Sequence, residues 1–544
     1  MKKPILFLFT ILIFLSLSCN ALRPGGIRQI TPTPSASPST PTGGPPPLAG
    51  SDTPLPTSLA RADEVTPPRA AAPTHTPIPP TATRRPTRAR PTATATSGPA
   101  VSAPPLAGQV GEPTIGDPYI PELGNAGYDV LHYALQITLD PAQVYVPAAA
   151  ITLTAASTLE ALGRFSLDFI GFNIDALKVN GQDAYWERAD GKLIVSPPAP
   201  LGLAETFTVE VIYHGEPVSS PSPYVPFDDH LGLVFRTGLN RLYVISEPDG
   251  ARYWFPCNDH PRDKATFRFE VTAPQGLVGI ANGVLVDTAA AVPNAFPNGR
   301  AGDRFTWEEN HPMATYLATA AVGDYVRVEG VSPQGVKLRS YVFPNQRPQM
   351  EMLTPTIGEA LDWMSELFGP YPFDEFGFVT VNGLGGALET QDMVILGALN
   401  EEVMIHELAH MWFGDLVSLD SWGEMWRNEG FATYITALWF ARDDPGALDA
   451  TVRNWERAFE GRDLYPLDDP PPPSLFGLQS YYGGALMVHA LRGEIGDEAF
   501  FNGLRSYLQR YADSAASDAQ FQEEMEAAAG RSLDDFFARW IKDS

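Results

Sequence analysis

The segment that most restricts the fold of this chain is His-Glu-Leu-Ala-His at residues 406–410. Two histidines four positions apart lie on one face of a helix, and the pattern predicts a helix here. Both imidazoles can then hold one metal ion, and Glu407 can reach a water bound to that ion. By chance this pattern arises in about one chain in a hundred of this composition. A pair of surface histidines without a metal is the alternative interpretation.

A third candidate ligand, Glu429, follows nineteen residues after His410. It lies in Trp-Arg-Asn-Glu-Gly-Phe-Ala, an apolar stretch that predicts the start of another helix. Two histidines and one carboxylate fill three positions around a tetrahedral zinc ion and leave the fourth open for water, as a catalytic zinc requires. We therefore predict one zinc ion per chain on His406, His410 and Glu429.

The hydrophobic pattern divides the rest of the chain into two parts. Residues 118–332 contain short alternating runs separated by turns, which is typical of strands. From residue 350 the period becomes helical, with strands near the start of this part. The sequence predicts an α+β protein, with a β-rich domain at 118–332 and a mainly helical domain at 333–544. The helical segments are expected at 356–367, 403–413, 430–441, 485–492, 499–511 and 533–541, and the strands at 376–381 and 393–395.

The N-terminal part has a different composition. Residues 1–19 combine two lysines with an apolar run, as in a signal peptide. The run ends at Cys19 in a sequence that resembles the cleavage box of bacterial lipoproteins, although Ser16 stands where leucine is usual. Residues 20–117 are rich in Pro and Thr, cannot form a core and predict a disordered stalk. We expect a lipid on Cys19 to anchor the chain to a membrane at the cell surface; plain secretion and an uncleaved anchor are the alternatives.

Charge and cysteine content exclude several classes of function. The chain has 37 Lys and Arg against 64 Asp and Glu, a net charge of −27, which argues against nucleic acid as a partner. Its two cysteines are Cys19, in the leader, and Cys257. We therefore expect neither a disulfide framework nor a tetra-thiolate zinc site in the folded part.

Three motifs together resemble the aminopeptidase N family of zinc metallopeptidases, which includes the leukotriene hydrolases. They are residues 406–417, the stretch Ala-Arg-Tyr-Trp-Phe-Pro-Cys-Asn-Asp-His-Pro at 251–261, and Leu-Asp-Asp-Phe-Phe-Ala-Arg-Trp at 533–540. The resemblance covers residues 119–544. It implies a saddle-like β-rich domain followed by a thermolysin-like catalytic domain, a buried packing role for Cys257, and peptide substrates with a free N-terminus.

The resemblance also implies which residues bind the substrate. Residues 385–390, Gly-Gly-Ala-Leu-Glu-Thr, are similar to the family's Gly-x-Met-Glu-Asn strand, with Leu and Thr replacing the usual Met and Asn. Gly386 and Ala387 are then expected to bind substrate, and Glu389 to be the main anchor of its ammonium group. Glu247 matches a second anchor from the first domain. Taken alone, either glutamate is more often an ordinary exposed acid.

Catalytic groups are implied in the same way. Residues 480–486, Ser-Tyr-Tyr-Gly-Gly-Ala-Leu, resemble the family's Tyr-x-Lys-Gly-Ala segment and match Tyr481 to the donor that stabilises the oxyanion. Gly483 replaces the customary Lys, and the adjacent Tyr482 leaves the register open. Asp415 is expected either to orient a ligating histidine or to belong to the helix end.

The resulting hypothesis is a zinc aminopeptidase outside the cytoplasmic membrane, in which Glu407 transfers the protons. A thermolysin-like endopeptidase and a lipid-epoxide hydrolase are the alternative enzymes. A surface binding protein with an inactive zinc site is the alternative of a different class.

Overall fold

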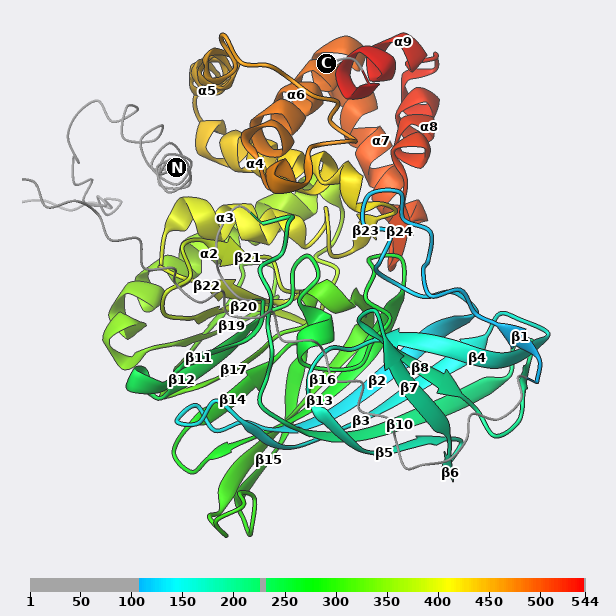
Figure 1. The fold of residues 1–544 in the computed structure, drawn as a ribbon. Helices are drawn as coiled ribbons and strands as arrows, with labels where there is room; N and C mark the ends of the chain where they lie inside the picture. The colour runs from blue at the N-terminus through cyan, green and yellow to red at the C-terminus, as the bar shows by residue number, and fades with distance from the viewer. Residues whose placement is uncertain (1–106, 226–230, 543–544) are drawn as a thin grey trace, which may run out of the picture. The chain divides into compact units, whose positions relative to one another are not determined.

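The computed structural model describes residues 107–225 and 231–542, which form a β-rich half followed by a mainly helical half (Figure 1). This agrees with the predicted α+β class. The predicted leader with Cys19, and the stalk up to residue 106, lie outside the described residues. Among the residues that are described, no helix is both long and apolar enough to cross a bilayer.

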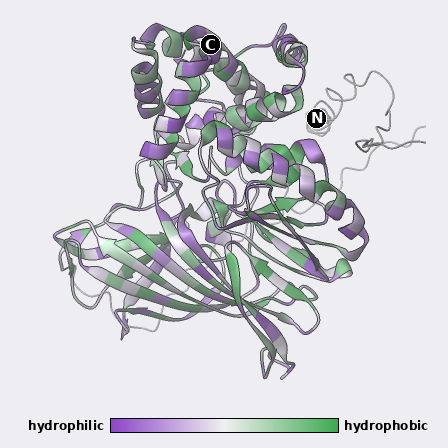
Figure 2. Cartoon of the chain, turned by 180° about the vertical axis from the view of Figure 1, so that it is seen from behind, coloured by the Kyte–Doolittle hydropathy of each residue, from purple (hydrophilic) through white to green (hydrophobic). Residues whose placement is uncertain are grey.

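The β-rich half is built on an eight-stranded sheet in the order β15-β16-β13-β2-β3-β10-β5-β6. Neighbouring strands pair antiparallel except β13 and β2, which are parallel. Buried and exposed residues alternate along β2 and β10, and hydrophobic and hydrophilic colours mix along the strands (Figure 2). The strands are β2 (Tyr128–Thr138), β3 (Val146–Ser157), β5 (Asn173–Val179), β6 (Gln182–Asp183), β10 (Thr206–Gly215), β13 (Lys264–Pro274), β15 (Val284–Val292) and β16 (Gly302–Ala314).

Two smaller sheets complete this half. One has the order β1-β4-β8-β7, with β9 beside β4, and the other has the order β11-β12-β17-β14. Their strands are β1 (Gln109–Val110), β4 (Ala161–Asp168), β7 (Tyr185–Ala189), β8 (Lys192–Ser196), β9 (Leu201–Gly202), β11 (Gly232–Arg236), β12 (Arg241–Ile245), β14 (Val278–Ala281) and β17 (Ala320–Gly323). The predicted packing residue Cys257 is a buried free thiol in the core of this half.

The helical half begins with a five-stranded sheet in the order β18-β19-β20-β22-β21 and continues with helices α3 to α9 (Figure 1). Its strands are β18 (Val326–Val331), β19 (Lys337–Val342), β20 (Glu375–Thr380), β21 (Ala387–Leu388) and β22 (Met393–Leu396), with the separate pair β23 (Val417–Leu419) and β24 (Ser514–Ala516). The helices are α2 (Arg347–Phe368), α3 (Glu401–His410), α4 (Trp426–Ala441), α5 (Pro445–Ala458), α6 (Gly484–Ile495), α7 (Asp497–Arg510), α8 (Asp518–Ala529) and α9 (Asp534–Phe537).

Helices α5 and α8 have no counterpart among the predicted segments, although the sequence contains a signal for each. In α5 the apolar residues Leu448, Val452 and Trp455 recur at helical spacing. In α8 the side chains of Ser517 and Gln520 form a capping box at the start of the helix. Both helices could therefore have been predicted.

The folded part begins before residue 118, which corrects the predicted end of the stalk at residue 117. Strand β1 pairs with β4, and Asp117 is only 1% exposed. A two-residue strand and a single buried carboxylate leave no periodic pattern, so the hydrophobic pattern could not reveal them. The predicted division at 332/333 falls in the turn between the paired strands β18 and β19, so the sheet of the helical half starts at Val326.

Asp117 connects the two halves. Its carboxylate lies 2.7 Å from His260 Nε2 in the β-rich half, and it accepts hydrogen bonds from Ser421 Oγ (2.8 Å) and Trp422 N (3.0 Å) just before α4. Burial alone would raise the pKa of Asp117, but the hydrogen bond and charge of His260, together with the Trp422 N–H, lower it to about 2. A charged carboxylate therefore holds both halves at the entry to α4.

Candidate active site

Helix α3 presents the two predicted histidines on one face. The side chain of Asn400 accepts hydrogen bonds from the backbone N–H groups of Glu402 (2.9 Å) and Val403 (3.2 Å), which fixes the first turn of the helix. His406 and His410 lie one turn apart further along α3, with their Nε2 atoms 3.3 Å apart.

The predicted ligands His406, His410 and Glu429 converge on one point. Oε2 of Glu429 lies 3.1 Å from His406 Nε2 and 3.6 Å from His410 Nε2. One ligand atom from each residue lies within 4.8 Å of the other two. Two imidazole nitrogens and one carboxylate oxygen are the donor set of many catalytic zinc sites, so the residues present fit a zinc ion.

The electrostatic surroundings of the ligands also suit a metal cation. The pKa of His406 is lowered, mainly by burial, so its imidazole is neutral. Burial raises the pKa of Glu429, but hydrogen bonds with His406 and His410 outweigh it and bring the pKa to about 2. Nδ1 of His410 lies 3.1 Å from the carbonyl oxygen of Phe413, which directs Nε2 into the cluster. Burial lowers the pKa of His410, but the carboxylates around it outweigh burial and raise this pKa well above its usual value, so the site has a negative potential that attracts cations.

Glu407 lies beside the metal ligands. It is buried, and ligand atoms of Glu407, Glu389 and His410 lie within 4.8 Å of one another. Burial is the largest cause that raises the pKa of Glu407, and the charges of Glu389 and Glu429 add to the rise. A carboxyl group with a raised pKa can both accept and return a proton near neutral pH, as a general base must.

The structure places Tyr481, and not Tyr482, at the metal site. The ring of Tyr481 stacks on that of His406, with centroids 5.9 Å apart and an angle of 15° between the planes. The ring of Tyr482 packs against Trp455 of α5 instead. Both tyrosines belong to a π-helical turn, Gln479–Gly483, a distortion that is frequent at functional sites.

Two glycines bring this turn close to α4. A Cβ atom on Gly430 would lie 2.7 Å from the Cα atom of Gly484, and a Cβ atom on Gly484 would lie 2.8 Å from the Cα atom of Gly430. Only glycine allows the two backbones to approach so closely. Because Gly430 follows Glu429 directly and Gly484 begins α6 just after the π turn, the contact fixes the ligand Glu429 relative to Tyr481.

The two predicted ammonium anchors come from different halves and meet. Glu247 follows β12 and is 6% exposed, and Glu389 follows β21 and is 4% exposed. The two carboxyl groups are within hydrogen-bonding distance of each other. Within the described residues, neither Oε1 atom has a cationic or N–H partner. Burial is the main cause that raises the pKa of both groups, and the charge of Glu389 adds to the rise at Glu247. The pair therefore offers unused acceptors to a cation.

Gly386 and Ala387 lie at the edge of the five-stranded sheet. Gly386 O accepts a hydrogen bond from Gly397 N (2.9 Å), and β21 pairs with β22 on one side. Since β21 is the last strand in the sheet order, its other side can pair with an extended peptide. Thr390, which departs from the family pattern, donates its hydroxyl to Met393 O (2.5 Å) within the turn that follows.

Asp415 closes the end of α3 through its backbone. Its N–H donates to His410 O (3.0 Å), and Lys264 Nζ donates to its carbonyl oxygen (2.5 Å). Nδ1 of His410 lies beside Phe413 O, so the Asp415 carboxylate does not orient this ligand. Of the two expectations for Asp415, the structure fits the helix-end role.

Tyr316 is a residue at the site that the sequence did not reveal. It extends from the β-rich half, and its hydroxyl lies 3.4 Å from Gly414 O and 3.5 Å from Nδ2 of Asn428, the neighbour of Glu429. A single tyrosine outside any recognisable motif carries no signal.

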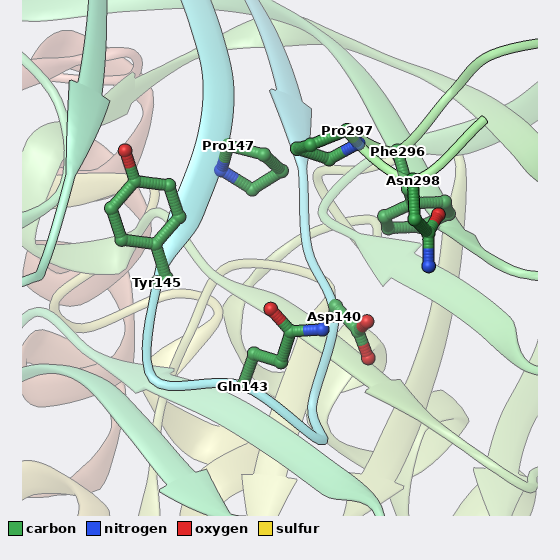
Figure 3. A pocket seen from close by; sticks show the side chains of 7 residues that line it. All are labelled: Asp140, Gln143, Tyr145, Pro147, Phe296, Pro297 and Asn298. Atoms are coloured by element: carbon green, nitrogen blue, oxygen red, sulfur yellow. The ribbon is translucent and has the colours of Figure 1, made fainter. Parts of the chain in front are cut away.

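A separate pocket of about 100 Å³ lies outside the site, between the β2–β3 turn and the β15–β16 hairpin (Figure 3). Its lining residues are Asp140, Gln143, Tyr145, Pro147, Phe296, Pro297 and Asn298.

Comparisons with known proteins agree with this geometry. Residues 130–317 match the model of the peptidase M1 N-terminal domain, and residues 396–540 match that of the peptidase family M1 domain. An M1 zinc metallopeptidase from Deinococcus radiodurans, solved as a mutant with a Tyr-Ser-Ala substrate, is 31% identical with a TM-score of 0.71. That match covers 79% of this chain and 98% of the solved one.

Longer relatives match over part of their length. Aminopeptidase M1 of Arabidopsis thaliana is 28% identical over 422 residues, which cover 69% of this chain and 46% of the relative. Aminopeptidase N of Streptomyces lividans is 28% identical over 336 residues, which cover 55% of this chain and 38% of the relative. The chain thus spans less than half the length of these curated relatives.

Proposed function

Because the chain belongs to the M1 family of zinc metallopeptidases, we propose that it is an aminopeptidase that removes N-terminal residues from peptides. The observation that carries this proposal is the pair Glu247 and Glu389, whose buried carboxyl groups meet beside the metal ligands. Carboxylates bind an ammonium group by charge-assisted hydrogen bonds. An anchor for the substrate ammonium near the metal selects peptides with a free N-terminus.

The residues of the site divide the catalytic work between them. Zinc on His406, His410 and Glu429 would polarise the scissile carbonyl and acidify the attacking water. Glu407 accepts a proton from this water and passes it to the leaving amine. Tyr481 donates a hydrogen bond to the oxygen that becomes negative as the carbonyl is attacked.

The substrate backbone is held at the sheet edge. Strand β21, together with Gly386 before it, offers backbone groups to an extended peptide, which would add a strand to the sheet. Glu389 at the end of β21 and Glu247 from the β-rich half hold the terminal ammonium. The Tyr-Ser-Ala peptide bound to the Deinococcus radiodurans relative belongs to the substrate class proposed here.

Removal of one ligand tests the metal site. Purified protein is expected to contain one zinc ion per chain, and His406→Ala is expected to lose both the zinc and peptide hydrolysis, because two remaining ligands hold zinc poorly. Metal analysis and a hydrolysis assay measure these effects. His489→Ala is the matched control, since His489 is a partly buried histidine beside Tyr434 and outside the site. Equal zinc contents in the wild type and His406→Ala would reject the ligand assignment.

We further propose that the enzyme acts outside the cytoplasmic membrane, anchored by a lipid on Cys19. The leader, the lipoprotein-like sequence at Cys19 and the Pro- and Thr-rich segment support this location. A tethered enzyme of this kind would act on peptides at the cell surface.

Lipid labelling tests the anchor. Hydrolytic activity is expected to sediment with membranes, and Cys19→Ser is expected to abolish incorporation of labelled fatty acid, because the thiol is the acceptor. Cys257→Ser, at the other cysteine, is the control and should keep the label. Unlipidated wild-type protein free in the culture medium would contradict the anchor and leave plain secretion.

A further inference from the structure

Glu389 lies on a short turn, residues 389–392, that joins β21 to β22. The last residue of this turn, Asp392, has a φ angle of 55°, in the left-handed region that favours glycine. Its side chain is also buried, with 1% of the residue exposed. A buried carboxylate on a strained backbone persists only when the surrounding structure holds it firmly.

The partners of Asp392 supply this hold. Oδ1 accepts hydrogen bonds from Gly283 N (3.0 Å) and Arg339 Nη2 (3.0 Å). The backbone oxygen of Asp392 accepts from Arg339 Nη1 (3.1 Å) and Gly377 N (2.9 Å). Arg339 is itself buried, donates to Gly283 O and lies 3.2 Å from Glu375 Oε2. One arginine therefore ties the turn to β19, β20 and the β-rich half.

The β-rich half holds the turn at two further positions. Asn282 Nδ2 donates to Gln391 O (2.8 Å) and to Leu317 O (3.0 Å). Glu309, on β16, is buried beside Asp392; burial, followed by the charge of Asp392, raises the pKa of Glu309. Residues 282 and 283 form the turn between β14 and β15. This turn of the β-rich half therefore hydrogen-bonds to the turn 389–392, which carries Glu389.

We propose that Asp392 is a positioning residue that keeps Glu389 beside Glu247 for recognition of the substrate ammonium. Burial and the neighbouring charge disfavour two ionised carboxyl groups side by side, and a free turn would let Glu389 move away as the pair ionises. The contacts of Asp392 prevent this movement before the substrate arrives. Both anchors then take their positions from the β-rich half, Glu247 directly and Glu389 through Asp392. This inference rests on the proposed aminopeptidase function.

Binding in a catalytically silent protein tests the proposal. Glu407→Gln protein serves as the parent, and calorimetry gives its affinities for the peptide Tyr-Ser-Ala and for the N-acetylated form. Adding Asp392→Asn is expected to weaken binding of the free peptide by about tenfold, the scale of a small misplacement of a binding group. The affinity for the acetylated peptide should not change. The affinity ratio, free peptide over acetylated peptide, is therefore expected to fall. Zinc content and thermal stability are measured on the same samples.

Asp168→Asn is the matched control. Asp168 is a buried aspartate whose Oδ1 lies 2.5 Å from Lys192 Nζ within the β-rich half, so its loss should lower stability without changing the affinity ratio. Asn282→Ser gives a second, milder variant that loses the bond to Gln391 O, and it is expected to lower the ratio as well. A folded, zinc-containing Asp392→Asn protein with an unchanged ratio would reject the positioning role alone. Equal affinities of the parent for both peptides would reject the proposed aminopeptidase function, and this role with it.

Discussion

Replacing Glu407 by glutamine is expected to lower kcat by a factor of about 10² or more while the zinc stays bound. Glutamine keeps the shape of the side chain but cannot accept the proton of the attacking water. Since Glu407 is not among the three converging ligands, the metal content should be unchanged. Steady-state kinetics on amino-acid amide reporters, with metal analysis of the same sample, measure both quantities. Loss of zinc in Glu407→Gln would contradict the assignment of Glu407 as the base.

The neighbouring tyrosines give this experiment an internal comparison. Tyr481→Phe should also lower kcat by about 10² with zinc retained, because it removes a donor to the oxyanion. Tyr482→Phe keeps the ring that packs on Trp455 and is expected to stay close to the wild type. If Tyr482→Phe were impaired and Tyr481→Phe were not, Tyr481 could not be the donor.

Acetylation of the substrate amine is expected to reduce kcat/KM by orders of magnitude. The cap removes the cation and leaves Glu247 and Glu389 desolvated and unpaired, a loss of several kcal/mol. The measurement is kcat/KM for one dipeptide with a free and with an acetylated amine. Comparable values would refute exopeptidase action while leaving the zinc site intact, and a thermolysin-like endopeptidase would be the better description.

The two anchors should differ in their contributions. Glu389→Ala is expected to reduce kcat/KM for the free dipeptide more than Glu247→Ala, because Glu389 lies at the end of the strand that binds the substrate backbone. The preference for a free amine should shrink in both variants. An equal preference in the wild type and in Glu389→Ala would remove Glu389 from the anchor.

The sequence predicted the parts of the molecule that depend on local spacing. Helical periodicity placed His406 and His410 on one face, and the predicted zinc and family are confirmed by the family models and the solved relatives. The α+β order of the two halves is confirmed as well. The meeting of Glu247 with Glu389 depended on the resemblance to a family, because residues so far apart in the chain leave no local pattern.

Features fixed by single long-range contacts could not be predicted. The bonds of Asp117 to His260 and Ser421 join distant segments, and they show why the folded part starts before residue 118. The contacts of Asp392 with Arg339 and Gly283 are of the same kind. In each case a buried aspartate contacts residues that are distant in the chain. Neither the hydrophobic periodicity nor the composition of the sequence contains information on such contacts.

The backbone contact between Gly430 and Gly484 closes a loop in the path of the chain. Gly430 lies near the start of α4 and Gly484 begins α6, so the chain completes α4, forms α5 and passes through the π turn before its backbone meets α4 again. Because this contact sets the separation of Glu429 and Tyr481, that separation does not depend on the length of the intervening segment 442–478. Parts of this segment away from the contacts of Trp455 with Tyr482 and of Tyr465 with Gln479 can diverge during evolution, or accept an inserted module, while the reaction centre keeps its dimensions.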